Sequence, residues 1–485
     1  METKRTPFDK YLAQLEKASK VLNLDPRIYA RLQVPKLLLR GTVIVEQDDG
    51  SWKTSKIYRA HHSRARGIPQ GGTRWDVAVC ESEVKFLSAM MTMKNTIVGI
   101  WHGGGKGGIC GDKFALSMGE RERTCRGYIR AIEPWIGDRK DGPAPDVNTG
   151  GQEMAWFRDE LEEIRGYDCA GSFTGKPVYL GGSLGRADAT ALGAVYATEA
   201  MLEKIRSQEE NITTKKGTIF SWNPSKEISI QGFGNAGNNY FRLMAARGHK
   251  IISVSDRSGV IYKKDGFDYA DLHAFCYDDK GQKIHKVSDY PKKDTMSSEE
   301  AEKLSLKAYI FAPAAFEDTI NADMAKKLEC KFGIELANGP CTEEADEILA
   351  KRGITFISDI YSSGGGVRVS SAEKSQDLSN APWTEEQVNV WLKTRMFKAF
   401  DLIEATREKY NLPTFRESAV VYAVSEVAEA MQSRGNLDKP LSWYTKTIDL
   451  PPVVMVKGDN KFSLKYILKK STSTAIFYLK TLVDI

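Results

Sequence analysis

The stretch from Glu227 to Ile357 constrains the fold of this chain most, because short apolar runs alternate there with helical segments. A helix is predicted at 235–247, directly after the first of these runs. Alternation of this kind is typical of a parallel sheet with helices on both faces, so we expect an α/β fold. The strands are predicted at 227–231, 250–255, 308–312, 331–335 and 354–357.

The first predicted strand leads directly into the glycine pattern GFGNAG, which opens the helix. In this context Gly232 makes a tight turn, Gly234 lets a pyrophosphate approach the backbone, and Gly237 packs the helix against the strand. Amide groups at the helix N-terminus then bind the phosphates. The pattern predicts a Rossmann-type dinucleotide-binding domain. Its expected cofactor contacts are Gly232, Phe233, Gly234, Asn235, Ala236 and Gly237.

An acidic residue ends the next predicted strand. Asp256 lies about 20 residues beyond the last glycine of the motif, where a carboxylate binds the ribose 2′-hydroxyl. This favours NAD as the cofactor, because a carboxylate would repel the 2′-phosphate of NADP. Arg257, the next residue, keeps NADP open as the alternative. Without the glycine motif, Asp256 would be an ordinary turn residue.

Length and composition exclude several classes of protein. A chain of 485 residues is too long for one compact core and indicates two or three domains. Its net charge of +5 is mild and indicates neither nucleic-acid nor membrane binding. No apolar run reaches about 18 residues, so neither export nor a membrane span is expected. The seven cysteines include no CxxC pair, which favours reduced thiols in the cytoplasm and predicts no metal site.

Further elements are predicted on both sides of the alternating region. Capping-box patterns begin three helices, at Ser117, Thr384 and Thr414, and the last of these helices ends at Gly435. The polar stretch 206–216 is expected to be a surface loop. Other helices are predicted at 8–22, 81–94 and 187–204, strands within 36–58 around a turn at 48–50, and a bend at 171–185.

A second glycine-rich stretch, HGGGKGG at residues 102–108, contains a single lysine, Lys106. We expect a loop whose glycines let the backbone approach a bound substrate. Lys94, at the end of a Met-rich apolar helix, and Asp146, after two prolines, are its candidate partners. Taken singly, such residues are usually solvated or part of a turn. Together they indicate a site, because a lysine from which water is excluded can lose its proton near neutral pH.

These motifs occur in the order seen in a known family. From about residue 7 to 435 the chain resembles the glutamate/leucine/phenylalanine/valine dehydrogenases, and most closely the hexameric glutamate dehydrogenases. The matching segments are 71–74 (GGTR), 91–95, 103–108, 143–149, 174–177, 181–190, GFGNAG, 313–315, 337–340 and 365–367.

The resemblance implies a role for each of five residues. Lys106 corresponds to the catalytic lysine, Asp146 to the catalytic aspartate, and Lys94 to the lysine that binds the substrate α-carboxylate. Thr190 corresponds to the threonine that holds the nicotinamide amide, and Asn338 to an asparagine near the nicotinamide ribose. The implied reaction moves hydride from an amino acid to the nicotinamide, after which Lys106 activates water and Asp146 passes protons to the departing ammonia. Lys94 would also lower the pKa of Lys106 by like-charge repulsion. The implied partners are small: an amino acid, its 2-oxo acid and ammonia.

The predicted substrate pocket departs from the family pattern. Gln70 stands where glutamate enzymes of the family carry a lysine, beside Gly71, while Val367 and Ser370 match the rest of the pocket. A neutral hydrogen bond is about half as strong as a charge-assisted one. Three readings follow: glutamate bound weakly, another polar or branched-chain amino acid, or glutamate with a charge supplied by Arg368. We favour L-glutamate. Two other positions depart from the family, Ser363 where asparagine is common and His102, expected to be a packed loop residue.

The resemblance also implies the architecture. Residues 1–186, completed by helices at about 385–435, would form an α/β substrate and oligomerisation domain, and residues 187–384 the Rossmann-type domain, with the site in the cleft between them. A homohexamer is expected. Residues 436–485 have no assigned role and could be a cap, an arm or a tail. The alternative function is that of a regulator that binds nucleotide without catalysis.

Overall fold

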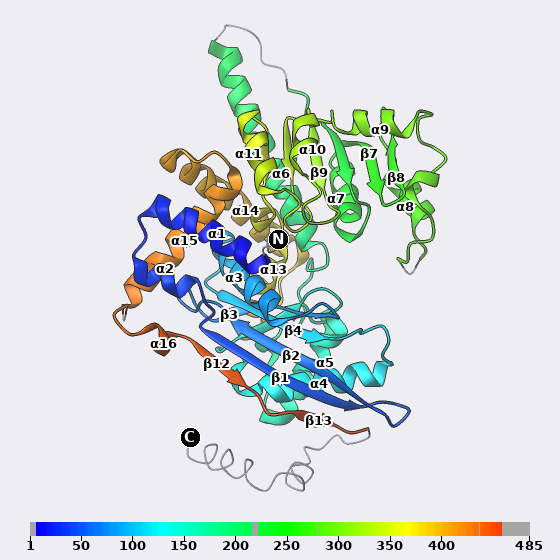
Figure 1. Ribbon diagram of the computed structural model, residues 1–485. Coiled ribbons are helices and arrows are strands. Elements are labelled where there is room, and N and C mark those ends of the chain that lie inside the picture. The colour runs from blue at the N-terminus through cyan, green and yellow to red at the C-terminus, as the bar shows by residue number, and fades with distance from the viewer. Residues whose placement is uncertain (1–5, 216–221, 280, 436, 458–485) are drawn as a thin grey trace, which may run out of the picture.

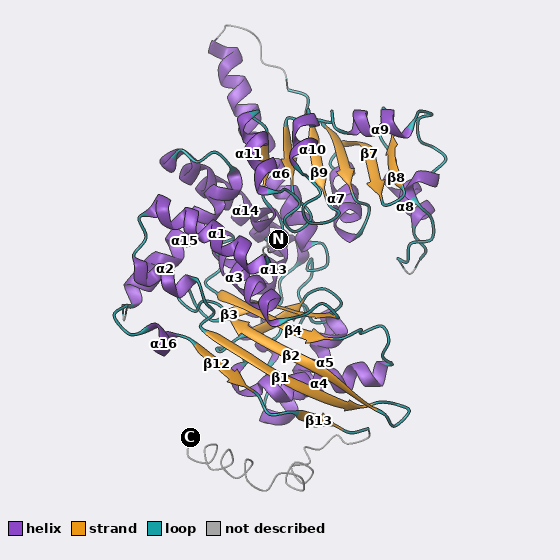
Figure 2. Ribbon diagram, viewed as in Figure 1, coloured by secondary structure: helices purple, strands orange, loops and turns teal. Residues whose placement is uncertain are grey.

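The computed structural model describes residues 6–215, 222–279, 281–435 and 437–457. Two sheets lie at opposite ends of the molecule, with a group of helices between them (Figure 1). Helices pack against each sheet (Figure 2). The intervening helices are α1 (Pro7–Leu22), α3 (Glu81–Ile97), α13 (Gly365–Ser379), α14 (Glu385–Tyr410) and α15 (Phe415–Arg434).

Within the described residues, the N-terminal sheet has seven strands in the order β12-β1-β2-β4-β3-β5, with β13 also paired to β1. Two of these strands come from the C-terminal segment, β12 (Lys446–Asp449) and β13 (Val453–Met455). β1 and β2 form an antiparallel hairpin, whereas β3 runs parallel to both β4 and β5. Side chains alternate between the two faces, so Leu39 and Val43 pack towards α4 and α5 while Leu38 packs towards α3. The elements are β1 (Leu37–Glu46), β2 (Trp52–His61), β3 (Pro69–Asp76), β4 (Gly103–Cys110), β5 (Gly142–Pro145), α4 (Met118–Ile132) and α5 (Gly151–Arg165).

In the part of the chain that the structure describes, the C-terminal sheet has six strands in the order β11-β10-β9-β6-β7-β8. All its pairings are parallel except that of the edge strand β8, which was not predicted. The predicted parallel sheet and α/β fold are therefore confirmed. Its strands are β6 (Glu227–Gln231), β7 (Lys250–Asp256), β8 (Gly259–Tyr262), β9 (Ile310–Pro313), β10 (Phe332–Ile334) and β11 (Thr355–Ile357). The helices are α6 (Ala189–Lys215), α7 (Asn235–Ala245), α8 (Tyr269–Cys276), α9 (Ser298–Ser305), α10 (Ala322–Lys327), α11 (Glu343–Lys351) and α12 (Asp359–Ser362).

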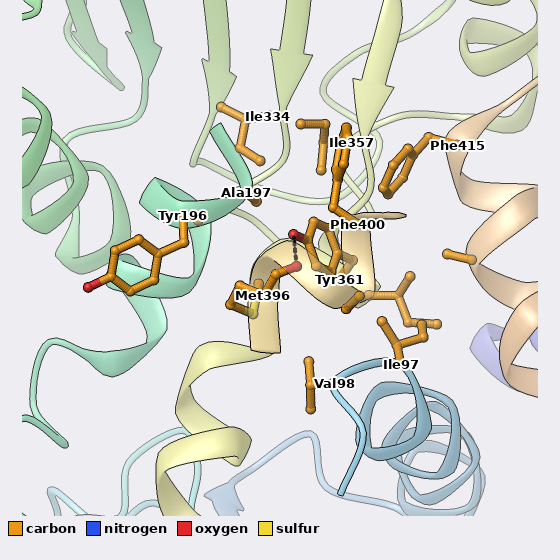
Figure 3. Close-up of a cluster of buried hydrophobic side chains, with 14 of the residues drawn as sticks. Ile97, Val98, Tyr196, Ala197, Ile334, Ile357, Tyr361, Met396, Phe400 and Phe415 are labelled. Carbon is orange, nitrogen blue, oxygen red and sulfur yellow. Dashed lines mark hydrogen bonds between the residues drawn. The ribbon is translucent and has the colours of Figure 1, made fainter. Parts of the chain in front are cut away.

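One continuous hydrophobic core joins the two sheets. Ile97 and Val98, at the end of α3, pack in the same cluster as Ile334 and Ile357 of the C-terminal sheet (Figure 3). The buried Tyr361 hydroxyl donates a 2.7 Å hydrogen bond to a main-chain carbonyl of α14, so its polar atom is satisfied within this core. This packing fixes α12 and the start of α13 against α3, which carries Lys94.

The C-terminal segment adds two strands to the N-terminal sheet. β12 (Lys446–Asp449) and β13 (Val453–Met455) pair in parallel with β1, and Met455 is buried against α4. Before them, α16 (Leu441–Tyr444) places Tyr444 4.9 Å from the Arg31 guanidinium, on α2 (Pro26–Leu32). Residues 437–457 are thus part of the fold, which the sequence did not indicate, and 458–485 lie outside the described residues.

Two other predictions were wrong. The stretch HGGGKGG is not a loop, because β4 begins at Gly103 and lies between β2 and β3 in the sheet. The polar stretch 206–216, predicted to be a loop, continues helix α6 as far as Lys215, since its Gln, Glu and Lys residues are all compatible with a helix. Lys216 lies outside the described residues. The capping boxes at Ser117 and Thr384 are confirmed, and Thr414 caps α15. Among the described residues no helix combines the length and apolar character needed to cross a bilayer.

Candidate active site

Lys106 and Asp146 meet at one edge of the N-terminal sheet. Lys106 lies on β4 and is 4% exposed, and Asp146 follows β5, two strands away in the sheet. The Lys106 Nζ lies 2.6 Å from Asp146 Oδ1, forming a largely buried ion pair. Gly72 of the intervening strand leaves the necessary space, because a Cβ there would come within 2.7 Å of the Asp146 Cβ.

A third charged side chain, Arg74, completes this group. Its Nε donates to Asp146 Oδ2 at 2.8 Å, and its other end pairs with Glu83 of α3. Burial lowers the pKa of Lys106 from the usual 10.5; Asp146 opposes this effect, while Arg74 and Lys94 add to it. Burial acts against the charged form of Asp146 as well, but the two neighbouring cations outweigh it and lower the pKa of that carboxyl. The expected effect of Lys94 on Lys106 is thus confirmed, although burial and Arg74 exceed it.

The glycines around Lys106 are required by close packing. A Cβ at Gly104 would lie 2.1 Å from the Ser88 carbonyl oxygen of α3, and one at Gly107 would lie 2.3 Å from the Tyr128 hydroxyl of α4. α3 on one face of the sheet and α4 on the other therefore contact the β4 backbone directly, leaving no room for side chains at these two glycines. Close approach of backbone is a usual reason for glycine inside a strand.

Lys94 is tied to the segment that precedes α13. Its Nζ donates a 2.7 Å hydrogen bond to Ser363 Oγ, and Ser363 Oγ donates to the Asp359 carbonyl at 2.5 Å. The Asp359 carboxylate accepts a 3.1 Å hydrogen bond from the Gly339 amide. Gly339 follows the predicted ribose contact Asn338, which is exposed. A chain of contacts thus connects the loop after β10 with the predicted carboxylate-binding lysine.

The predicted side-chain pocket is assembled from β3 and α13. Gln70 is 2% exposed, and Ser370 Oγ accepts a 3.1 Å hydrogen bond from Arg186 Nε. The suggestion that Arg368 supplies a charge to this pocket is wrong. Its guanidinium lies over the Trp391 ring of α14, 3.2 Å from the ring centre, on another side of α13. Val367 lies at the start of α13, and a Cβ at the neighbouring Gly366 would come within 2.5 Å of Thr190 Oγ1.

The GFGNAG motif has the geometry of a phosphate-binding turn. Gly232 has a positive φ of 106°, and a Cβ at Gly237 would lie 2.0 Å from the Gly232 carbonyl oxygen. By contrast, a Cβ at Gly234 would have nothing within 4 Å, so the backbone there is open to a ligand. Asn235 begins α7, and Phe233 is buried in the core beneath the turn. The residues present therefore fit a dinucleotide.

Asp256, at the end of β7, already has several hydrogen-bond donors. Ser258 donates through its amide at 2.7 Å and through its hydroxyl, Val287 donates through its amide at 3.1 Å, and Lys283 pairs with the carboxylate. Burial acts against the charged form of Asp256, but these donors outweigh it and lower its pKa to about 2. Arg257 is exposed, and its guanidinium lies 5.1 Å from the Phe316 ring centre. The Asp256 carboxylate and the Lys283 ammonium thus form an ion pair at the end of β7.

Comparison with known proteins agrees with this geometry. Residues 181–435 match the sequence model of the glutamate/leucine/phenylalanine/valine dehydrogenases, and residues 35–163 match that of their dimerisation domain. The chain is 38% identical over 442 residues to the NAD-specific glutamate dehydrogenase of Clostridioides difficile, covering 88% of this chain and 98% of that protein. It is 35% identical over 430 residues to the NADP-specific glutamate dehydrogenase A1 of Halobacterium salinarum, covering 89% and 98%.

The chain belongs to the glutamate/leucine/phenylalanine/valine dehydrogenase family. The resemblance inferred from sequence is thereby confirmed, together with its assignment to the amino-acid dehydrogenases. The structure of glutamate dehydrogenase from Peptoniphilus asaccharolyticus, 34% identical, superposes with a TM-score of 0.74 and covers 89% of this chain and 100% of that one.

Sequence reasoning missed several charged residues that surround the site of this dehydrogenase. Arg74 and Arg186 lie within motifs that carried the resemblance, so those motifs were the available signal. No sequence pattern could have indicated the role of Arg416, because its three carboxylate partners are 57 to 81 residues away in sequence. It bonds Asp359 at 2.9 Å and Asp346 at 2.7 Å and also pairs with Glu335. Glu335 and Asp346 lie close to Cys341, but the Arg416 guanidinium supplies the positive charge there.

Proposed function

We propose that this chain catalyses the reversible oxidative deamination of L-glutamate to 2-oxoglutarate and ammonia, with NAD as hydride acceptor and NADP as the alternative. The buried Lys106–Asp146 pair beside Lys94 carries this proposal, because it combines an amine of lowered pKa with a proton carrier 2.6 Å away. The glutamate dehydrogenases among the relatives support glutamate as the substrate.

The proposed reaction begins with substrate binding by Lys94. Its ammonium, oriented by Ser363, pairs with the substrate α-carboxylate and directs Cα towards Lys106. NAD, held by the GFGNAG turn, would supply the chemistry of hydride acceptance when bound. The amino acid becomes a protonated imine when its Cα loses hydride and its ammonium group loses a proton, which the Asp146 carboxylate accepts.

Lys106 and Asp146 would then complete the conversion. Neutral Lys106 takes a proton from water as that water attacks the imine carbon, giving a carbinolamine. Asp146, within hydrogen-bond distance of Lys106, returns the proton that it took from the substrate ammonium to the nitrogen. Ammonia then leaves, and the Asp146 carboxylate accepts the hydroxyl proton as the 2-oxo acid forms. Burial of Lys106 favours its neutral form, and Arg74 keeps Asp146 in position.

The assembly and location are part of the same proposal. A glutamate dehydrogenase from Thermus thermophilus described as hetero-hexameric, 30% identical with a TM-score of 0.77, supports a hexamer, which we propose to be homomeric here. All seven cysteines are unpaired, which supports a cytoplasmic location. Light scattering of the purified chain tests the hexamer directly.

One assay panel tests the reaction. L-glutamate, L-glutamine, L-leucine and their 2-oxo acids with ammonia are each assayed with NAD and NADP in parallel, following absorbance of the reduced nicotinamide. The proposal predicts the highest kcat/KM for glutamate with NAD. Faster turnover of leucine or glutamine would assign another amino acid, and no turnover with tight NAD binding would identify a regulator.

A further inference from the structure

Two buried polar side chains without partners line one small space next to β3. Both side-chain atoms of Gln70 and the Lys374 Nζ lack a hydrogen-bond partner among the described residues. Gln70 is 2% exposed and Lys374 5% exposed. A Cβ at Gly142 would lie 3.6 Å from Gln70 Cγ and 3.8 Å from Lys374 Nζ, so both side chains border the same point. Buried polar groups are normally satisfied, which suggests that this space receives a polar ligand.

The nearest carboxylates are already bound to other donors. Asp141 accepts from Arg59 at 2.6 Å and from His61 at 2.7 Å. Asp377 accepts from Lys176 at 2.8 Å, and Asp138 accepts from the Ser172 hydroxyl at 2.6 Å. The Lys374 ammonium has no hydrogen bond to any of these carboxylates, so its positive charge is available to bind an anionic ligand.

The pKa of Lys374 reflects this arrangement. Burial lowers it to about 8, against the opposing influence of Asp138, Asp141 and Asp377, while Lys176 lowers it further. A bound carboxylate would restore the charged form. His102 borders the same region, but burial, with Lys374 as a second cause, lowers its pKa to about 4, so it carries no charge at neutral pH.

Lys374 lies on the pocket side of α13. It follows Ser370 by four residues, one turn of helix, so the two side chains share a face. Ser370 is one of the predicted pocket residues and is bonded to Arg186. Arg368, two residues before Ser370, is on roughly the opposite face and packs on Trp391.

We propose that Lys374 is the specificity-determining residue that binds the side-chain carboxylate of the substrate, with the Gln70 amide as a neutral second donor. Glutamate enzymes of the family carry the positive charge on a lysine at the position of Gln70 in β3. In this chain Lys374 of α13 would supply that charge instead. This inference rests on the proposed function, since only a substrate such as glutamate presents a second carboxylate. It explains how a glutamine at position 70 is compatible with glutamate as substrate.

The test compares L-glutamate with L-norvaline, which lacks the side-chain carboxylate. Steady-state kinetics are measured for wild type, Lys374→Met, the exchange variant Gln70→Lys/Lys374→Met, and Arg368→Met as the control on the same helix. In Lys374→Met we expect kcat/KM for glutamate to fall about 100-fold, mainly through KM, while that for norvaline stays within about threefold. The exchange variant should recover at least a tenth of wild-type kcat/KM for glutamate, and Arg368→Met should keep the wild-type preference.

The outcomes separate the two proposals. If wild type does not prefer glutamate to norvaline, the proposed substrate is wrong, and the role of Lys374 fails with it. If wild type prefers glutamate and Lys374→Met keeps that preference, only the role of Lys374 is overturned. Equal losses of kcat/KM for both substrates would also overturn this role, because they indicate a structural effect. The same holds if the exchange variant still turns over norvaline but does not recover kcat/KM for glutamate.

Discussion

The Lys106 ammonium nitrogen lies 2.6 Å from Asp146 Oδ1, with β3 lying between β4, which carries Lys106, and β5, which Asp146 follows. Lys106 can reach across because the intervening position is Gly72, where a side chain would collide with Asp146. The sheet therefore sets the separation of the pair, and Arg74 of the same intervening strand bonds the second carboxylate oxygen of Asp146.

Replacing Lys106 should remove turnover without removing cofactor binding. We expect Lys106→Met to lower kcat for glutamate by about 1,000-fold, because general acid-base catalysis is lost while the GFGNAG turn is unchanged. Stopped-flow and steady-state assays measure the rate, and calorimetry measures NAD affinity. Lys56→Met, at an exposed position of β2, is the matched control and should keep full activity. Retained turnover in Lys106→Met would refute the assigned role.

The Lys94–Ser363 hydrogen bond should affect binding more than chemistry. Ser363→Ala removes the hydroxyl that orients the Lys94 ammonium, so we expect KM for the amino acid to rise about fivefold, equivalent to about 1 kcal/mol, with kcat within twofold. Ser363→Asn keeps a hydrogen-bond acceptor and should restore KM. A fall in kcat with unchanged KM would contradict this interpretation.

Asp256 should control the choice between NAD and NADP. Asp256→Ser removes the carboxylate that would repel a 2′-phosphate and leaves Lys283 without its partner. We expect the ratio of kcat/KM for NAD to that for NADP to fall by about 10-fold or more, about 1.4 kcal/mol. Asp265→Ser, at an exposed position after β8, should leave the ratio unchanged. The assignment fails if both variants give the wild-type ratio.

Discrimination between glutamate and norvaline should decrease at alkaline pH. The pKa of Lys374 is about 8, so above that pH its ammonium is lost and with it the favourable interaction with a carboxylate. We expect the ratio of kcat/KM for glutamate to that for norvaline to be constant well below pH 8 and to fall as pH rises through 8. Taking the ratio cancels the titration of Lys106, which acts on both substrates. Lys374→Met should show no such decline.

Arg416 should be important for stability. It is largely buried among Glu335, Asp346 and Asp359, so Arg416→Met leaves carboxylates without their cation. Removing one partner of a buried ionic group costs about 3–5 kcal/mol, and urea unfolding should show a loss of this size. Lys326→Met, which breaks an exposed pair with Asp323, should change stability by less than about 1 kcal/mol. A small effect of Arg416→Met would show that the carboxylates find other partners.

The dinucleotide turn could be predicted from sequence because its determinants are local. Each of Gly232, Gly234 and Gly237 has the conformation or contact that the motif implies. The strand β4 was missed for the opposite reason. Glycine is rare in strands, and the packing of helices on both faces that requires it there is set by residues distant in sequence.

Lys374 shows which part of the site could not be predicted. Arg368 was predicted to supply the charge because it is close to Ser370 in sequence. Two residues along a helix, however, lead to roughly the opposite face. Lys374 is four residues from Ser370 and shares its face, and its proximity to Gln70 depends on how α13 packs next to β3 and β5. Contacts between residues so distant in sequence are determined by the whole fold.

The pairing of β12 and β13 with β1 limits how copies of this protein can associate. A strand has two hydrogen-bonding edges, and those of β1 are occupied by β2 on one side and by its own C-terminal segment on the other. Between Leu37 and Arg40, and again between Val43 and Val45, no free row of amides remains for a strand of a neighbouring copy. A neighbouring copy could therefore continue the sheet on this side only by pairing with β12 or β13 themselves, because the edge of β1 along these residues is already occupied.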